Sequence, residues 1–491
     1  MSIITIYNNG RKREFFFAPR VNLLELLREQ GFDVDAPCGG HGKCGKCRVL
    51  LDRGSGTESV LACTVVPDGD CTVYLPDSSA DLSWNFTTES VITEKGRSGF
   101  GAAVDLGTTT VAVSLFDLSD GRRLGSASRW NAQRSFGADV ITRISYCMDH
   151  PDGLKVLSEA IRTQISDMLG SLCGENDLDL SDIKEIFLAG NTVMQHIFAG
   201  ISPNGIAAAP FDPASYFDDG RPFMLGDIPV YFSPCVAGYV GGDITAGILG
   251  CGLGDSAGRA LFIDVGTNGE MALGGSGGFV SCAVASGPAF EGAGISCGMP
   301  AANGAVNKVW LTDGGLGYEV IGGGEAAGIC GSGLLDLAAC LLELGYIDES
   351  GCLEENGDGE AAFYLTDRVY VDQRDIRQLQ LAKAAVAAGI RLLTESEGLT
   401  YGDIDSLYLA GGFGNRLRPE SAVRIGMLPK EMLGRISTAG NTSLAGAERA
   451  LLDPGSRETL NGIKNKCGYI ELSTHRKFND CFVDEMTFPE V

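Results

Sequence analysis

The most distinctive stretch of this 491-residue chain is a glycine-rich segment with three closely spaced cysteines. Cys38, Cys44 and Cys47 give the pattern C-x5-C-x2-C, and fifteen residues separate Cys47 from a fourth cysteine, Cys63. Thiolates are the soft ligands that hold zinc and iron–sulfur clusters. Glycine lets the backbone wrap closely around such a group and aim N–H donors at its sulfurs. The segment therefore predicts a metal site.

The spacing favours an iron–sulfur cluster over zinc. Plant-type [2Fe–2S] ferredoxins use C-x4-C-x2-C and a remote fourth cysteine, and this loop is one residue longer. Zinc knuckles usually have two C-x2–4-C pairs. Cys63 has no such close partner in the sequence, and the nearest cysteine after it is Cys71. We predict a [2Fe–2S] cluster with the ligands Cys38, Cys44, Cys47 and Cys63. Zinc is the alternative metal, Cys71 the substitute fourth ligand, and His41 is interpreted as a solvated loop residue.

The remaining cysteines lie mostly in apolar segments and are expected to be buried as small hydrophobic side chains. Cys297 and Cys330 differ, because they lie in the glycine loops "ISCGMP" and "GICGSG". A second cluster shared across a dimer is the alternative for these two.

Two acidic glycine turns predict a site for phosphate. "DLGTTT" (Asp105–Thr110) and "DVGTNGE" (Asp264–Glu270) each join a strand to a strand, so neither is a Walker A loop or a dinucleotide fingerprint. Backbone N–H groups and hydroxyls suit phosphate oxygens, and an aspartate suits hydrated Mg²⁺. We expect Asp105 and Asp264 to organise Mg²⁺. The predicted phosphate contacts are Gly107, Thr108, Thr109, Gly266, Thr267 and Asn268.

Further candidates lie outside these two turns. In "YLAGGFG", Gly411, Gly412 and Gly414 suit close approach by a flat base or a ribose. Asp243, in "GGD", either faces the nucleotide or serves a helix dipole. Asn191 is either a cleft residue or a helix cap.

The surrounding sequence predicts the elements that must position these residues. Residues 1–77 read as a small β-rich domain, with strand, Asn-Gly turn and strand in "SIITIYNNGRKREFFFA" and a helix in "NLLELLREQG". Residues 78–98 read as a short polar linker. Residues 99–491 are α/β, and the segments 101–125 and 260–284 resemble each other, which indicates an internal duplication. "LKVLSEAIRTQISDMLGSL" and "QLAKAAVAAGIRLLTESEG" read as helices, and "KEIFLAGN" and "DSLYLAGGFG" as strands that run into glycine turns.

Composition disfavours several kinds of binding partner and indicates the cellular compartment. The formal charge of −25, nearly all of it beyond residue 80, disfavours nucleic acid and anionic membranes as partners. We see no signal peptide and no apolar run of membrane-spanning length. Sixteen cysteines without a secretion signal indicate a reducing cytoplasm.

Beyond residue 99 the chain resembles the superfamily of actin, sugar kinases and heat-shock chaperone ATPases. "DLGTTT" and "DVGTNGE" look like its two phosphate motifs, and "LAGGFG" like its adenosine motif. "SPCVAGYVGGDITAGIL" and "NTSLAGAERALL" look like its two connecting helices. The resemblance implies a nucleotide between two lobes that open and close. The expected fold combines α+β and α/β parts: an N-terminal β-grasp ferredoxin-like domain, followed by a duplicated actin-like (ASKHA) ATPase fold.

Joined to a ferredoxin-like module, this fold is similar to the reductive activators of corrinoid enzymes. Supporting stretches are "NAQRSFGADVITRI", "AGNTVMQHIFAG", "SGPAFEGAGISCGMPA" and "EAAGICGSGLLDL". The resemblance implies ATP-dependent return of Co(II) to Co(I) in the corrinoid protein of a methyltransferase system. It also implies a low-potential donor resembling ferredoxin or flavodoxin, and a homodimer.

The sequence departs from that family in one respect. Longer members carry an extra linker and a middle domain between the two parts, whereas only residues 77–97 separate them here. Three rival functions stay open. They are an activator of a 2-hydroxyacyl-CoA dehydratase, a sugar or acid kinase with an accessory domain, and a metal-binding, chaperone-like ATPase with a zinc module.

Overall fold

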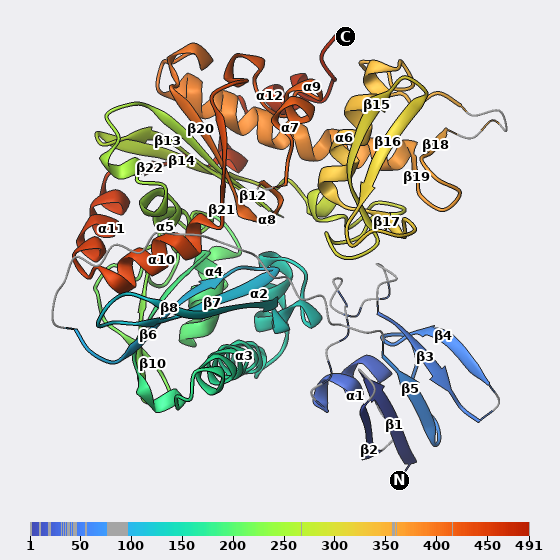
Figure 1. Ribbon diagram of the computed structural model, residues 1–491, viewed down its shortest axis with the longest axis vertical. Coiled ribbons are helices and arrows are strands. Elements are labelled where there is room, and N and C mark those ends of the chain that lie inside the picture. Colours follow the sequence, from blue (N-terminus) through green and yellow to red (C-terminus); the bar gives the residue numbers. More distant parts are fainter. Residues whose placement is uncertain are drawn as a thin grey trace.

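Figure 1 shows the chain as a computed structural model, with a small β-rich domain beside a larger two-lobed α/β unit. The structure describes residues 2–8, 11–17, 21–30, 32, 34, 36, 40, 42, 47–54, 56–75, 97–266, 268–355, 359, 361–414 and 416–490. Within those ranges no helix has the length and apolar character needed to cross a membrane.

The small domain is a five-stranded sheet covered by one helix. Its strands are β1 Ser2–Asn8, β2 Arg11–Phe17, β3 Arg48–Asp52, β4 Thr57–Leu61 and β5 Cys71–Tyr74, in the order β2-β1-β5-β3-β4. The central pair β1 and β5 is parallel. Helix α1, Leu23–Glu29, begins where the Asn22 side chain accepts a hydrogen bond from the Glu25 N–H, and its leucines enter the domain core. The predicted ferredoxin-like fold is confirmed.

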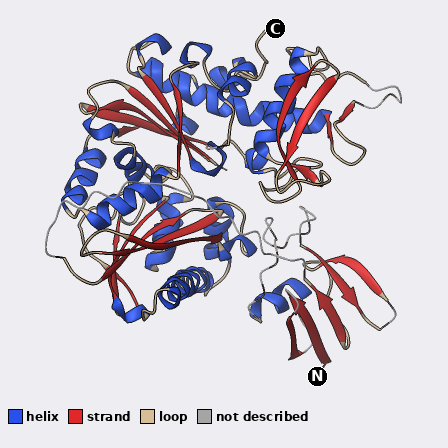
Figure 2. Cartoon of the chain, viewed as in Figure 1, coloured by secondary structure: helices blue, strands red, loops and turns tan. Residues whose placement is uncertain are grey.

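The first lobe is a six-stranded sheet that carries the first phosphate turn. Its strands are β6 Phe100–Leu106, β7 Thr110–Asp117, β8 Arg123–Trp130, β9 Ile183–Gly190, β10 Phe223–Leu225 and β11 Ile228–Phe232, in the order β10-β11-β9-β6-β7-β8. Its helices are α2 Val140–Asp149, α3 Gly153–Glu175 and α4 Thr192–Ala199. β6 reads as a nearly continuous apolar run because helices cover both faces of the sheet (Figure 2).

The second lobe repeats this arrangement around the second phosphate turn. Its strands are β12 Ala260–Val265, β13 Gly269–Gly275, β14 Gly278–Val284, β20 Ser406–Ala410, β21 Ile436–Gly440 and β22 Cys467–Tyr469, in the order β21-β20-β12-β13-β14-β22. In both lobes the strand before the turn pairs antiparallel with the strand after it and parallel with a later strand. The predicted internal duplication is confirmed.

Two helices between the lobes form a shared core. α5, Gly242–Gly250, and α10, Thr442–Leu452, pack together, and their apolar residues cluster with residues from both sheets. A Cβ at Gly446 would overlap the carbonyl oxygen of Ala246, so only glycine permits this close approach. These are the two predicted connecting helices.

The rest of the second lobe surrounds that framework. Its other elements are β15 Ala305–Thr312, β16 Gly315–Val320, β17 Gly328–Ile329, α6 Gly331–Glu343, β18 Ala362–Tyr364, β19 Tyr370–Asp372, α7 Gln373–Ser396, α8 Gly411–Gly414, α9 Pro419–Arg424, α11 Gly455–Asn465 and α12 Phe478–Asp484. Short 3-10 helices η1, Ala132–Ser135, and η5, Pro288–Glu291, border the region between the lobes. The predicted glycine turn after β20 is instead the short helix α8, which Gly411 enters with φ +81°.

The two parts of the molecule touch through helix α1. The guanidinium of Arg28 lies 5.1 Å from the ring centroid of Phe136, and that ring packs edge-on against Tyr146 of α2. Asp139 and Val140, between these two aromatic residues in sequence, line the cavity between the lobes. Almost all of the predicted linker, residues 78–98, lies outside the described residues, so its boundaries remain predictions.

Candidate functional site

The β3–β4 hairpin brings two of the predicted cluster ligands together. Cys47 directly precedes β3 and Cys63 follows β4, and the Ala62 N–H donates to the Cys47 carbonyl at 2.8 Å. The two sulfur atoms lie 3.2 Å apart, and both residues are buried. Cys38, Cys44 and His41 lie outside the described residues.

Glycines beside this cysteine pair have the conformations that a close-fitting loop needs. Gly40 and Gly42 have φ values of +91° and +70°, in the left-handed region that other residues rarely adopt. A Cβ at Gly40 would lie 3.1 Å from the Leu24 side chain and 3.7 Å from the Cβ of Cys63. The backbone at Gly40 therefore lies against both helix α1 and Cys63.

Strand register separates Cys71 from the cysteine pair. β3 and β5 are antiparallel, with Asp52 opposite Thr72, so Cys71 lies level with Arg53 at the far end of β3 from Cys47. At about 3.3 Å per residue, six residues of strand place Cys71 about 20 Å from Cys47. Cys71 is therefore excluded as the substitute fourth ligand.

The alternative cluster pair, Cys297 and Cys330, shows no metal-binding arrangement. The Cys297 sulfur lies 3.5 Å from the Arg368 carbonyl oxygen, and the Cys330 sulfur lies 3.4 Å from the Ser332 hydroxyl. Within the part of the chain that the structure describes, no three His, Cys, Asp or Glu side chains are grouped as for a metal ion.

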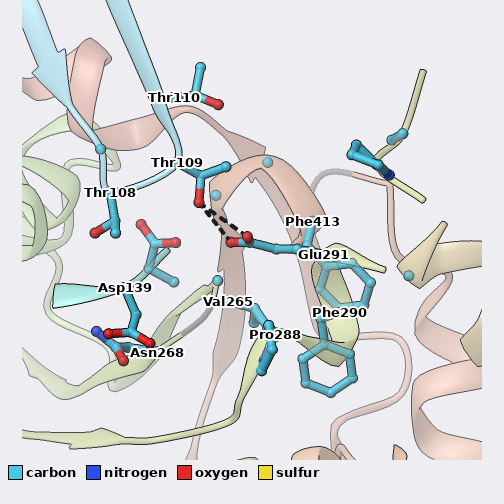
Figure 3. A pocket seen from close by; sticks show the side chains of 18 of the residues that line it. Thr108, Thr109, Thr110, Asp139, Val265, Asn268, Pro288, Phe290, Glu291 and Phe413 are labelled. Carbon is cyan, nitrogen blue, oxygen red and sulfur yellow. Dashed lines mark hydrogen bonds between the residues drawn. The ribbon is translucent and has the colours of Figure 1, made fainter. Parts of the chain in front are cut away.

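A cavity of about 340 Å³ lies between the two lobes, and most of the predicted nucleotide residues line it. The first phosphate turn contributes Asp105, Gly107, Thr108 and Thr109, and the second contributes Asp264, Gly266 and Asn268. Figure 3 shows Thr108 and Thr109 facing Asn268 and Val265 across the space. Thr267 lies outside the described residues.

The adenosine motif forms one end of this cavity. Gly411 and Gly412 line it, whereas Gly414 packs against Leu409. A Cβ at Gly411 would overlap Oδ1 of Asp264, so this glycine lets the adenosine motif approach the second phosphate turn.

Three side chains hold the first phosphate turn in place. Asn131 Nδ2 donates to the Gly107 carbonyl at 2.8 Å, and Asn191 Nδ2 donates to the Thr108 hydroxyl at 2.7 Å. Asn191 also caps α4 through Oδ1, so both interpretations of this residue are correct. Arg143 Nη2 donates to the Thr108 carbonyl at 2.6 Å, and burial lowers the pKa of Arg143 to about 9. These contacts preorganise the turn before any ligand arrives.

Four carboxyl groups line the cleft: Asp105, Asp243, Asp264 and Glu270. Burial raises the pKa of Asp264 to about 7, with the charge of Asp105 as the second cause. Burial, followed by the charges of Asp264 and Asp105, raises the pKa of Asp243 to about 8. Burial and the same group of charges also raise the pKa of Glu270. These carboxyl groups therefore interact electrostatically, although no three of them are grouped as ligands of a metal ion in the described part of the chain.

Asp105 is the most firmly held of the four. It accepts hydrogen bonds from Asn441 Nδ2 at 2.8 Å and from the Ser443 hydroxyl at 2.7 Å. Both donors belong to the start of α10, so the second connecting helix orients the first phosphate turn. Asp243 lies in the first turn of α5, where it suits the helix dipole, and it also lines the cleft that is predicted to hold the nucleotide.

Several of these residues carried no assigned role in the sequence. Arg143, Glu291, Asn441 and Ser443 lie in stretches that support the family resemblance, namely "NAQRSFGADVITRI", "SGPAFEGAGISCGMPA" and "NTSLAGAERALL". No spacing rule in these stretches assigned a role to the individual residues.

The fold and the two sites define a class of protein, in which a ferredoxin-like domain is joined to an ASKHA-type ATPase. Residues 6–68 match the 2Fe-2S iron-sulfur cluster binding domain. Residues 100–256 match the RACo middle region, and residues 259–491 match the C-terminal domain of RACo, the ASKHA domain.

Relatives covering most of the chain narrow this class. The corrinoid activation enzyme RamQ of Eubacterium limosum is 34% identical over 427 residues, which are 80% of this chain and 71% of that protein. The Co(II) methylated amine-specific corrinoid protein reductase of Methanosarcina barkeri is 25% identical over 430 residues, 79% of this chain and 77% of that protein. A solved structure of a reductive activator for corrinoid, iron-sulfur protein superposes with a TM-score of 0.73 at 31% identity, covering 100% and 99% of the two chains. The chain belongs to the RACo family.

These matches correct one expectation. The middle region is present, at residues 100–256, and it forms the first lobe of the ATPase.

Proposed function

We propose that this protein is an ATP-dependent reductive activator that returns Co(II) in the corrinoid protein of a methyltransferase system to Co(I). The observation that carries the proposal is the presence in one chain of a buried cysteine pair in a ferredoxin-like domain and an acidic cleft between two ATPase lobes. The family relatives, named for corrinoid activation and reduction, support it.

The cysteine site fits a [2Fe–2S] cluster with Cys38, Cys44, Cys47 and Cys63 as ligands. Two neighbouring buried sulfurs and glycines in left-handed conformations suit a cluster held by a close-fitting loop. Such a cluster supplies one-electron transfer. The protein buries Cys47 and Cys63, and it anchors α1 beside them, because the Leu24 N–H donates to the Ala62 carbonyl at 3.0 Å.

The cleft fits ATP with Mg²⁺. Burial, and then the charges of neighbouring carboxyl groups, keep the pKa values of Asp243 and Asp264 high. A divalent cation would stabilise the ionised form of these groups, with Asp105 and Asp264 as its organisers. Gly107, Thr108, Thr109, Gly266, Thr267 and Asn268 would hold the phosphates. Gly411 and Gly412 would border the adenosine, and Gly414 would support them from behind.

The two sites are coupled by lobe closure. Reduction of Co(II) is uphill for ordinary cellular donors, so ATP must favour a state in which electron transfer proceeds. Closure around the nucleotide is the two-state element, and the electron itself need not pass through ATP. A low-potential donor resembling ferredoxin or flavodoxin supplies the electron. We also propose that the protein forms a homodimer and acts in the cytoplasm.

An anaerobic spectroscopic assay tests this function. The full-length protein is mixed with a chemical reductant, a corrinoid protein and Mg·ATP, and conversion of the Co(II) absorption band to that of Co(I) is followed. We expect conversion to depend on ATP. Equal rates with and without ATP would refute the coupling. A featureless visible spectrum with stoichiometric zinc would instead favour the zinc alternative.

A further inference from the structure

Glu291 places a carboxylate between the two phosphate turns. The Thr109 hydroxyl of the first turn donates to its two carboxylate oxygens, at 3.2 and 3.1 Å. On the other side, a Cβ at Gly266 of the second turn would lie 3.8 Å from Oε1 of Glu291. Figure 3 shows the carboxylate of Glu291 pointing toward Thr109 across the space between the lobes. Glu291 therefore lies between the two turns that we propose to hold the phosphates of the nucleotide.

The segment that carries Glu291 is rigidly held. The ring of Phe290 stacks on that of Phe413 in the adenosine motif, with centroids 4.7 Å apart and planes 16° apart. A Cβ at Gly331 would overlap the Phe290 carbonyl oxygen, and one at Gly292 would overlap that of Met299. The 3-10 helix η5 is thus fixed between α6 and α8. A carboxylate on such a support needs little reorganisation to act.

Glu291 also differs from the acidic cluster in its surroundings. Burial and the charges of neighbouring carboxyl groups raise the pKa of Asp264 and Asp243. Glu291 instead accepts a hydrogen bond from a hydroxyl, and its charge interacts with the guanidinium of Arg143. A carboxyl group beside the phosphate turns is positioned to accept a proton.

We propose that Glu291 is the catalytic carboxylate of ATP hydrolysis in this protein. It orients a water molecule and takes its proton as the water oxygen bonds to the γ-phosphorus. The bond from that phosphorus to the bridging β,γ-oxygen breaks, giving ADP and inorganic phosphate. Thr109 exchanges its hydrogen bond with Glu291 for one with the phosphate. This inference rests on the proposed ATP-dependent function and adds to it the group that separates ATP binding from ATP hydrolysis.

The test compares Glu291→Gln with wild type in the full-length protein. Glutamine keeps the shape and a hydrogen bond to Thr109 but accepts no proton. General base catalysis typically contributes 10²–10⁴-fold, so we expect single-turnover hydrolysis of Mg·ATP to slow by about 10²–10³-fold. The affinity for a non-hydrolysable ATP analogue should stay within about threefold of wild type. The exposed Glu325→Gln, which alters a surface ion pair with Arg368, is the matched control and should behave like wild type.

The conservative variant Glu291→Asp provides a further readout. It should recover part of the hydrolysis rate that Glu291→Gln loses, because it restores a carboxyl group at this position. Hydrolysis by Glu291→Gln within threefold of wild type would overturn the proposal. The proposal would also be overturned if Glu291→Gln hydrolysed ATP at the normal rate but bound the ATP analogue a hundredfold more weakly. Glu291 would then serve binding alone.

The corrinoid assay separates this inference from the proposed function. If the wild type hydrolyses ATP through Glu291 but never reduces a corrinoid protein, the function fails and the catalytic assignment stands. If the wild type reduces the corrinoid protein with ATP yet Glu291→Gln hydrolyses ATP normally, the function stands and the assignment fails.

Discussion

The carboxyl group of Asp264 should leave a measurable signature in the stability of the nucleotide-free protein. Burial and the charge of Asp105 raise its pKa to about 7, whereas an aspartate in an unfolded chain titrates near about 3.9. The folded state keeps this proton to higher pH than the unfolded chain does. Unfolding therefore releases a proton between about pH 4 and pH 7, and stability must fall as pH rises through that window.

The variant Asp264→Asn removes this titration while it keeps the shape of the side chain. Each pH unit between the two pKa values corresponds to about 1.4 kcal/mol. Relative to a low pH at which both states are protonated, the titration of Asp264 therefore lowers the stability by at most about 4 kcal/mol at pH 8 and about 1.5 kcal/mol at pH 5. Because the side chain is only half-buried and meets cleft water, we expect roughly half of these values. Asp264→Asn should thus be more stable than wild type at pH 8, by a margin that narrows toward pH 5.

Thermal unfolding with EDTA and without nucleotide, at pH 5, 6.5 and 8, measures this margin. At about 1–2 °C per kcal/mol for a domain of this size, the Tm difference should grow by a few degrees from pH 5 to pH 8. The exposed Asp367→Asn serves as the control and should show a constant difference. A margin that is the same at all three pH values would refute the raised pKa. Mg·ATP should reverse the order, because only wild type keeps the cation ligand.

Other perturbations test the remaining contacts. Cys47→Ser should abolish the visible spectrum of a [2Fe–2S] cluster and leave ATP-analogue binding intact, whereas Cys71→Ser should keep the spectrum; loss of the cluster in both would contradict the register argument. Arg28→Ala removes a cation–π contact of about 0.5–1 kcal/mol, so hydrogen exchange in α1 should rise a few-fold while ATP hydrolysis is unchanged, and unchanged exchange would mean that the contact is not formed in solution. Asn441→Ala should lower stability by about 1–2 kcal/mol through its lost helix cap, and should weaken Mg·ATP binding by about tenfold because Asp105 loses a donor. Asn441→Asp, which keeps the cap but adds charge beside Asp105, should retain most of the stability and none of the binding.

Local patterns in the sequence were sufficient for the fold and for much of the site. The spacing of the cysteines, two acidic glycine turns and the order of motifs predicted a ferredoxin-like domain and a duplicated ATPase, and both were found. Such patterns are readable because backbone geometry limits them: a strand–turn–strand with glycine looks the same wherever it occurs. The glycine run after β20 was misread, because a four-residue helix has too little periodicity to reveal itself.

Contacts between segments far apart in the sequence could not be predicted from local patterns. Asn441 reaches Asp105 across 336 residues of sequence, and Glu291 reaches Thr109 across 182. Neither pair has a spacing rule, because the contacts arise only when α10 packs between the sheets and η5 is clamped against the adenosine motif. Similarly, two cysteines eight residues apart, Cys63 and Cys71, looked interchangeable until strand register put them at opposite ends of β3.

The sequence by itself determined the chemistry available to this protein. It has soft sulfur ligands near the N-terminus, and two phosphate turns, each with an aspartate, later in the chain. The tertiary structure decided which of those groups meet. It brought Cys47 next to Cys63, and it placed four carboxyl groups in the lining of one cleft. It also set Glu291 between the two phosphate turns. The physical reason is that residue type sets what a side chain can bind, whereas burial, charge and proximity exist only after the lobes have packed.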